Sequence, residues 1–123
     1  MKTELTPKES KHLIKLGAPK EKASAIYIDG DTTIDGIELS SMSVSDVFSL
    51  TDLLEILPKV MYKDGLAYDY NLVLYWEEDM KLWRVVYDAI GENMSSVEAP
   101  ELIDALYQLA CWYYGEYLKS EKK

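Results

Sequence analysis

One continuous stretch decides the fold of this chain: Tyr70-Asn71-Leu72-Val73-Leu74-Tyr75-Trp76, then Glu77-Glu78-Asp79-Met80-Lys81, then Leu82-Trp83-Arg84-Val85-Val86-Tyr87. Side chains on each flank alternate with a period of two, which is the period of a β-strand. The acidic middle part interrupts this alternation and is typical of a solvated turn. We therefore predict an antiparallel β-hairpin with a tryptophan on each side of its turn, stabilised by aromatic and β-branched cross-strand pairs.

A helix follows the hairpin, and we predict that it runs from Pro100 to Leu118. At about 100° per residue, its apolar side chains share one arc. This arc holds Leu102, Leu106, Leu109, Ala110, Tyr113 and Tyr117, and the opposite arc holds Glu101, Asp104, Gln108 and Lys119. Trp112 is out of phase and is predicted to project into the polar arc. Residues 119–123 are predicted to form a frayed polar tail.

The N-terminal segment predicts a helix with clear end signals. Thr6-Pro7-Lys8-Glu9 is a capping box with proline at the first helical position. Gly17 follows the apolar positions as a stop signal. A short turn over Lys20–Ala23 and a short strand over Ala25–Ile28 come next.

The middle of the chain is punctuated by turn signals. Asp-Gly pairs at 29–30 and 35–36 favour a hairpin whose second strand we place at Thr32–Leu39. Residues 40–48 are rich in serine and support no assignment. Ser49 or Thr51 caps a short helix over Asp52–Leu57, which Pro58 ends. Another turn is predicted at residues 63–65.

These elements together predict an α+β fold. Its order is an N-terminal helix, a short β-hairpin, a middle helix, the tryptophan-flanked hairpin and a long C-terminal helix packed on the sheet. The chain has 123 residues, 48% of them hydrophobic, which is enough for one core without disulfide or metal staples. We therefore predict a single domain over residues 1–123.

Composition also bears on location. Cys111 is the single cysteine, so no intrachain disulfide can form, which favours a reducing compartment. No run approaches the roughly 18 apolar residues of a membrane span. The N-terminus lacks the apolar core of a signal peptide. We expect a cytoplasmic protein that does not bind membranes.

The net charge of −9 is distributed unevenly. Residues 1–28 carry +3, residues 29–118 carry −14, and the last five residues carry +2. An acidic body repels phosphate backbones, so direct nucleic-acid binding is disfavoured. The acidity serves either solubility alone or the recognition of a basic partner.

The residue inventory predicts no catalytic, cofactor or metal site. His12 is the only imidazole and stands among lysines without a partner that would set its charge. One cysteine and one histidine are too few for a structural zinc site. The segment 29–38 resembles a calcium loop, but Ile34 stands where the loop needs glycine and Ser40 where it needs glutamate.

Two features are candidate partner-binding residues. The first is Trp112, which is out of phase with the apolar arc of its helix. The second is the acidic turn Glu77, Glu78 and Asp79. Either a second element, such as the N-terminal helix or residues 40–48, covers the aromatic surplus of the last helix, or Trp112 contacts a homodimer mate or another protein.

Three segments carry a family resemblance: Leu16-Gly17-Ala18-Pro19-Lys20-Glu21-Lys22-Ala23-Ser24, Phe48-Ser49-Leu50-Thr51-Asp52-Leu53-Leu54-Glu55-Ile56-Leu57-Pro58-Lys59, and Glu98-Ala99-Pro100-Glu101-Leu102-Ile103-Asp104-Ala105-Leu106-Tyr107. With the hairpin between them, they resemble a family of small uncharacterised proteins of gut bacteria and their phages. The matched positions are caps, core leucines and a proline stop. The resemblance implies a phage or mobile-element origin and brings no activity or functional residue with it.

Function is expected to be non-catalytic binding: an intracellular binding or accessory protein, phage or mobile-element derived. One alternative is an acidic inhibitor that blocks a basic nucleic-acid-binding or toxin surface, which requires a contiguous negative patch. A second is a small-ligand binder or enzyme, which requires a concave pocket with convergent polar groups.

Overall fold

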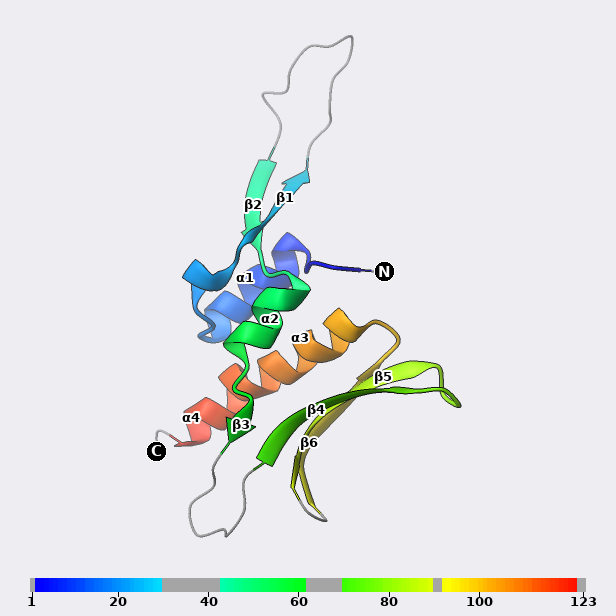
Figure 1. Cartoon of the computed structure of the whole chain (residues 1–123). Helices are drawn as coiled ribbons and strands as arrows, with labels where there is room; N and C mark the ends of the chain where they lie inside the picture. The colour runs from blue at the N-terminus through cyan, green and yellow to red at the C-terminus, as the bar shows by residue number, and fades with distance from the viewer. Residues whose placement is uncertain (1, 30–42, 62–69, 90–91, 122–123) are drawn as a thin grey trace.

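A computed structural model describes residues 2–29, 43–61, 70–89 and 92–121 of the chain (Figure 1). The predicted α+β class is confirmed. In chain order the elements are α1 (Pro7–Leu16), η1 (Lys20–Lys22), β1 (Ala25–Asp29), β2 (Ser43–Val47), α2 (Leu50–Ile56), β3 (Val60–Met61), β4 (Tyr70–Glu77), β5 (Leu82–Ala89), β6 (Glu92–Ala99), α3 (Leu102–Trp112), η2 (Tyr113–Tyr117) and α4 (Leu118–Glu121).

The predicted tryptophan hairpin is confirmed as β4 and β5, the centre of an antiparallel sheet in the order β3-β4-β5-β6. Trp76 and Trp83 are direct cross-strand partners, and their rings meet edge-on with centroids 5.7 Å apart. This is a favoured geometry for two aromatic rings. Lys81 closes the turn with a φ of 55°.

The sheet is larger than the sequence predicts, because β3 and β6 were not expected. The short β3 pairs only with the first residues of β4, through Val60 to Asn71 and Met61 to Tyr70. Strand β6 pairs with β5 along its length, with an irregularity between Tyr87 and Asp88. Residues 92–99 have weak alternation, so their strand conformation depends on pairing with β5.

Helix α3 is the centre of the molecule. It packs on β5 and β6, and α1 and α2 lie on its other side (Figure 1). The predicted packing of the last helix on the sheet is therefore confirmed. Contacts on both sides explain why the helix is apolar around most of its circumference. Its fully buried side chains are Ile103, Ala105, Leu106, Leu109 and Ala110.

The end signals of α1 are confirmed. The Thr6 hydroxyl accepts from the Glu9 amide at 3.1 Å, and the Glu9 carboxylate accepts from the Thr6 amide at 3.0 Å. Gly17 ends the helix at a φ of 123°, a backbone angle that side chains with a Cβ rarely adopt. The hydroxyl of buried Ser10 accepts from the Phe48 amide, which ties α1 to the end of β2.

Ser49 is the cap of α2, and Asp52 completes a second capping box. The Asp52 carboxylate is 4% exposed and also accepts from the Ser24 amide and hydroxyl. Burial alone would raise the pKa of Asp52. The hydrogen bonds from Ser49 and Ser24 outweigh burial and lower that pKa below its usual value. The charged Asp52 carboxylate therefore joins residue 24 to the cap and first turn of α2.

Two buried tyrosines hold the segment after α2. The Tyr87 hydroxyl on β5 donates to the Pro58 carbonyl at 2.8 Å, and the Tyr114 hydroxyl on η2 donates to the Ile56 carbonyl at 2.7 Å. Burial raises the pKa of both phenols, that of Tyr114 to about 12. Both hydroxyls are therefore neutral donors at physiological pH.

The structure gives β1 a partner that the sequence does not predict. Strand β1 pairs with β2, whose residues 43–47 lie in the stretch for which the sequence supports no assignment. The segment Thr32–Leu39 and the turns at 35–36 and 63–65 lie outside the described residues. At the C-terminus, the helical conformation continues through Glu121, past the predicted end at Leu118.

Candidate functional site

The acidic turn lies at the end of the β4–β5 hairpin, and two of its carboxylates are engaged within the chain. Glu77 pairs with Arg84 at 3.1 Å. Glu78 pairs with Lys81 and accepts from the Trp76 indole at 2.7 Å. These two donors lower the pKa of Glu78. The turn is therefore a partly neutralised structure, and the acid-inhibitor alternative gains no support from Glu77 and Glu78.

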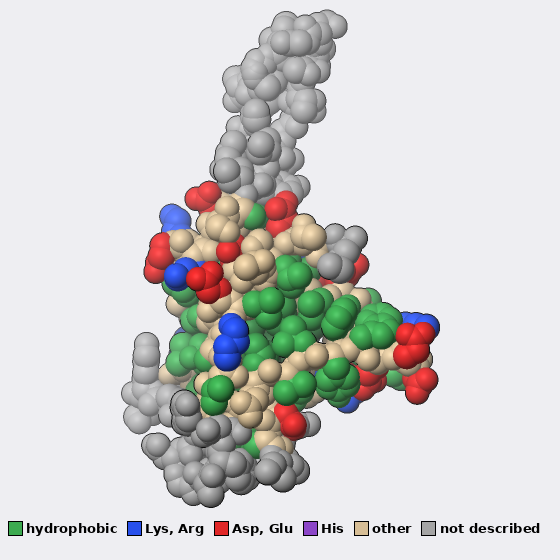
Figure 2. All heavy atoms as spheres, viewed as in Figure 1, with side chains coloured by type: hydrophobic (Ala, Val, Ile, Leu, Met, Phe, Trp, Pro, Cys, Tyr) green, Lys and Arg blue, Asp and Glu red, His purple; other side chains and the backbone are tan. Residues whose placement is uncertain are grey.

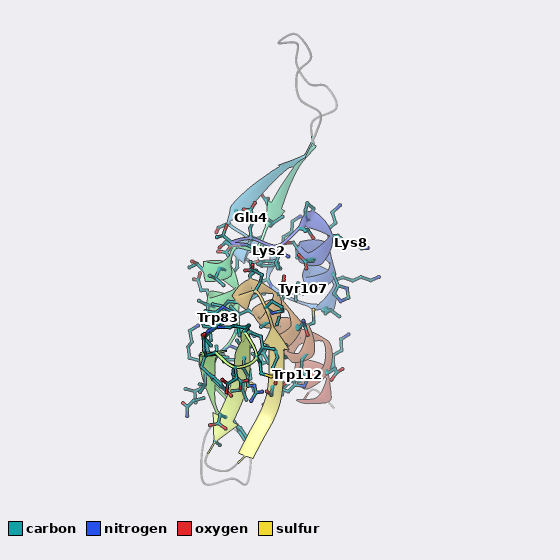
Figure 3. All side chains as sticks on the ribbon, turned by 90° about the vertical axis from the view of Figure 1, so that its right-hand side faces the viewer. Lys2, Glu4, Lys8, Trp83, Tyr107 and Trp112 are labelled. Atoms are coloured by element: carbon teal, nitrogen blue, oxygen red, sulfur yellow. The ribbon has the colours of Figure 1, made fainter. Side chains whose placement is uncertain are left out.

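Trp112 lies beside Gln108 of the polar arc, as the helical projection predicts, and both side chains line a hollow that is open to solvent. The Trp112 side chain, labelled in Figure 3, is nevertheless half-buried: its ring centroid lies 6.1 Å from that of Tyr87 on the sheet and 5.4 Å from that of Tyr117. The projection does not show this packing because it assumes one buried face, whereas α3 is covered by the sheet and by α1. Intramolecular packing accounts for most of the Trp112 surface.

His12 and Cys111, far apart in sequence, line the same hollow beside α1 and α3. It measures about 410 Å³ and is open to solvent; its other lining residues are Leu16, Gln108, Trp112, Gly115 and Glu116. Burial raises the pKa of the Cys111 thiol. It also raises the pKa of the Tyr107 phenol to about 12. A protonated thiol is a poor nucleophile. Cys111 is therefore not an activated nucleophile.

A second hollow lies over α1, with a volume of about 400 Å³. Its lining consists of Lys11, Ile14, Lys15, Lys20 and Asp46. The lysines and Asp46 are exposed, and such long side chains retain their hydration and rotamer freedom. In the described parts of the chain, neither hollow has the buried, convergent polar groups of a ligand site.

Exposed large hydrophobic side chains of the described residues gather on one stretch of the chain. They are Val73, Tyr75, Trp76 and Met80, with exposed fractions from 37% for Val73 to 62% for Met80. All four belong to β4 or to the turn that follows it. Figure 2 shows hydrophobic side chains gathered between α2 and this hairpin. Isolated exposed apolar residues need no explanation, but their concentration on one strand makes β4 a candidate interaction surface.

This stretch is also an open edge of the sheet. The Leu72 amide donates outward to the Lys59 carbonyl at 2.9 Å, and Lys59 directly precedes β3, so the pairing of β4 with this segment does not extend beyond Leu72. Main-chain groups of a strand alternate in direction, so the groups of Leu74 and Trp76 also point outward, while those of Val73 and Tyr75 point to β5. Among the described elements, no strand pairs with residues 73–77 of β4 on this side.

The two edges of the sheet differ in protection. Residues 70–77 contain no lysine, no proline and no bulge, and the one charge, Glu77, lies at the end. At the opposite edge, β6 carries Glu98 and runs beside the register irregularity at Tyr87 and Asp88. Charges and bulges are the usual means of keeping an edge from pairing with another chain. Strand β4 has no bulge and carries a charge only at its end.

The outer face beside this edge has an organised polar cluster. Arg84 donates to the Tyr75 hydroxyl at 3.1 Å, lies 5.7 Å from the centre of its ring, and also pairs with Glu98. The hydrogen bond from Arg84 to Tyr75 and its two carboxylate partners raise the guanidinium pKa further. These contacts hold the Tyr75 ring in a defined position on the open face.

Metal and membrane sites find no support in the part of the chain that is described. Within it, no three His, Cys, Asp or Glu side chains are placed to hold a metal ion. No described helix combines the length and apolar character needed to cross a bilayer. Most of the calcium-loop-like segment at 29–38 lies outside the described residues.

Comparison with known proteins adds no relative: no family model, curated protein or solved structure matches the chain. Functional inference rests on the geometry of β4 and its surroundings.

Proposed function

We propose that this chain is a non-catalytic, intracellular protein-binding module of phage or mobile-element origin, which binds an extended protein segment by strand addition at the open edge of β4. Two features, exposed hydrophobic side chains and an open strand edge, occur together on β4, and they carry this proposal. Three of the four exposed large hydrophobic residues of the described chain, Val73, Tyr75 and Trp76, lie on the part of β4 whose outward main-chain groups pair with no described strand. In strand addition, main-chain hydrogen bonds supply affinity and alternate side chains supply specificity.

The chemistry of the remaining surface agrees with a binding role. The two hollows contain exposed lysines or a protonated thiol, and neither arrangement activates a nucleophile or a general base. The single cysteine supports a reducing compartment. The family resemblance of residues 16–24, 48–59 and 98–107 supports the phage or mobile-element origin.

A photo-crosslinking side chain at position 75, compared with one at exposed Lys8 on α1, tests the proposal in living host cells. We expect a discrete protein adduct from position 75 and none from position 8. Capture alone is not sufficient, so the adduct is also measured with Leu74→Pro and with Leu74→Ala. Both variants lose the same half-buried side chain, but only proline removes the outward amide, which a strand edge tolerates.

Strand addition predicts that the adduct persists in Leu74→Ala and is largely lost in Leu74→Pro. Equal adducts from positions 75 and 8, or equal adducts in the two Leu74 variants, would contradict it.

A further inference from the structure

We infer that the occupant of the β4 edge is the β4 edge of a second copy of this chain, antiparallel about a twofold axis at Tyr75. This inference rests on the proposed binding role of the edge and names its partner. The two sheets would then join into one continuous sheet. In such an isologous contact, the same residues serve both copies.

Main-chain geometry selects this register. Direct hydrogen-bonded partners must both have outward amides and carbonyls, and Leu74 and Trp76 are the outward residues of the open segment. A twofold axis at Tyr75 places Leu74 of each copy opposite Trp76 of the other. Each of these pairs can then exchange both of its main-chain hydrogen bonds.

The two neighbouring registers, with the axis at Leu74 or at Trp76, do not pair open main-chain groups in this way. An axis at Leu74 would place Trp76 opposite Leu72, whose amide already donates to the Lys59 carbonyl. An axis at Trp76 would place Leu74 opposite residue 78, which lies in the turn rather than in β4. The axis at Tyr75 is the register that uses the open groups of β4 and displaces no described hydrogen bond.

Side chains are compatible with this register on both faces of the sheet. Tyr75 meets its own copy on the outer face, as a non-hydrogen-bonded pair with Cα atoms about 4.5 Å apart, the closest cross-strand spacing. On the inner face, Trp76 lies beside Leu74 of the other copy. Figure 2 shows further hydrophobic side chains between this hairpin and α2. Apolar surface on both sides of β4 would thus be covered.

Charges complement each other at the ends of the paired segment. Strand pairing in this register ends with Val73 opposite Glu77, because the Lys59 backbone already occupies the position opposite Leu72. The turn of one copy, which begins at Glu78, therefore approaches Lys59 of the other. Lys59 is exposed and caps the carbonyls of Leu54 and Leu57, and no carboxylate pairs with it among the described residues. The two acidic turns lie at opposite ends of the interface, so they do not repel each other.

The interface is small, so we expect the two copies to associate weakly. Five residues of strand extend about 17 Å. Contacts of this size belong to the weak class of protein interfaces. We therefore expect a reversible dimer whose population depends on concentration, with a limiting mass twice the chain mass of 14.1 kDa.

Sedimentation of purified full-length protein tests this inference over about 1 µM to 1 mM, a range that brackets weak affinities. Tyr75→Lys and Tyr75→Glu each place like charges against each other at the axis. We expect each variant alone to be monomeric and the equimolar mixture to recover the dimer, because position 75 opposes itself only about this axis. Like charges on opposing residues are destabilising, and an opposite pair is favourable.

A second pair of variants leaves Tyr75 and its contact with Arg84 unchanged. Val73 falls opposite Glu77 in the proposed register and is 37% exposed. Val73→Glu should weaken the dimer by several-fold to about thirtyfold, since symmetry repeats the unfavourable pair. Val73→Lys should retain it or tighten it. Denaturant unfolding of each variant at low concentration confirms that the monomer remains folded.

A wild type that stays monomeric at the highest concentration would overturn the second-copy inference, as would equal affinities of the two Val73 variants or a mixture that fails to dimerise. None of these results bears on the photo-crosslinking test, because another protein can still occupy the edge. Loss of the position-75 adduct in that experiment would instead remove the binding role itself.

Discussion

Replacing Tyr87 by alanine should lower the free energy of unfolding by about 3–5 kcal/mol, the range for truncating a large buried aromatic side chain. The side chain is fully buried on the helix-facing side of β5. It contacts the Trp112 ring and donates to the Pro58 carbonyl, so it joins the sheet, the last helix and the segment after α2. Chemical denaturation followed by far-ultraviolet circular dichroism measures the change.

Tyr87→Phe separates the hydrogen bond from the packing. It keeps the ring and removes the donor to Pro58, so we expect a loss of about 1–2 kcal/mol. Tyr113→Phe is the matched control: that hydroxyl has no hydrogen-bond partner among the described residues, and we expect a change within about 0.5 kcal/mol. Equal losses in the two phenylalanine variants would show that the Tyr87 hydroxyl does not hold the Pro58 segment.

Trp112→Ala is expected to act on stability rather than on assembly. Its half-buried ring packs on Tyr87 and Tyr117, so truncation should cost about 2–3 kcal/mol, somewhat below the range for a fully buried aromatic residue. The mass of the folded protein at a given concentration should not change. Denaturation and sedimentation on the same sample give both quantities.

Trp76→Ala is expected to act on assembly more than on stability. Its ring is 41% exposed and meets Trp83 edge-on, so we expect a loss of about 1 kcal/mol, the size of one aromatic pair. It should, however, weaken the dimer. If Trp112→Ala instead lowered the mass and left the free energy of unfolding unchanged, Trp112 would be an interface residue, as its position out of phase with the apolar arc first indicates.

Much of the fold could be predicted where the signals are local. The period of two in residues 70–87 determines the β4–β5 hairpin, and the capping boxes at Thr6 and Ser49 locate the starts of α1 and α2. Strand β6 could not be predicted in this way, because its conformation comes from pairing with β5. The pairing of β1 with β2 could not be predicted either, because Asp-Gly pairs report only local turns. Burial of Val47 and Phe48 anchors β2 in the core instead.

The candidate site depends on neighbours, which periodicity does not reveal. A helical projection of α3 cannot show that the sheet and α1 cover two of its sides. Trp112 is therefore out of phase in the projection although its ring packs within the chain. The acidic turn was found by composition, yet Arg84 and Lys81 engage two of its carboxylates. The sequence does contain one signal for the proposed surface: β4 has apolar side chains on both faces, including Val73 and Tyr75. That the edge is open follows only from the strand order.

Residue-resolved amide hydrogen exchange on β4 tests the central claim most directly. In dilute protein, we predict fast exchange at Leu74 and Trp76, whose amides point outward, and slow exchange at Val73 and Tyr75, whose amides face β5. At high concentration, Leu74 and Trp76 should slow as well, because the second copy covers them. Protection of Leu74 and Trp76 equal to that of Val73 and Tyr75 in the dilute monomer would contradict the account, since the edge of β4 would then be paired within the chain itself.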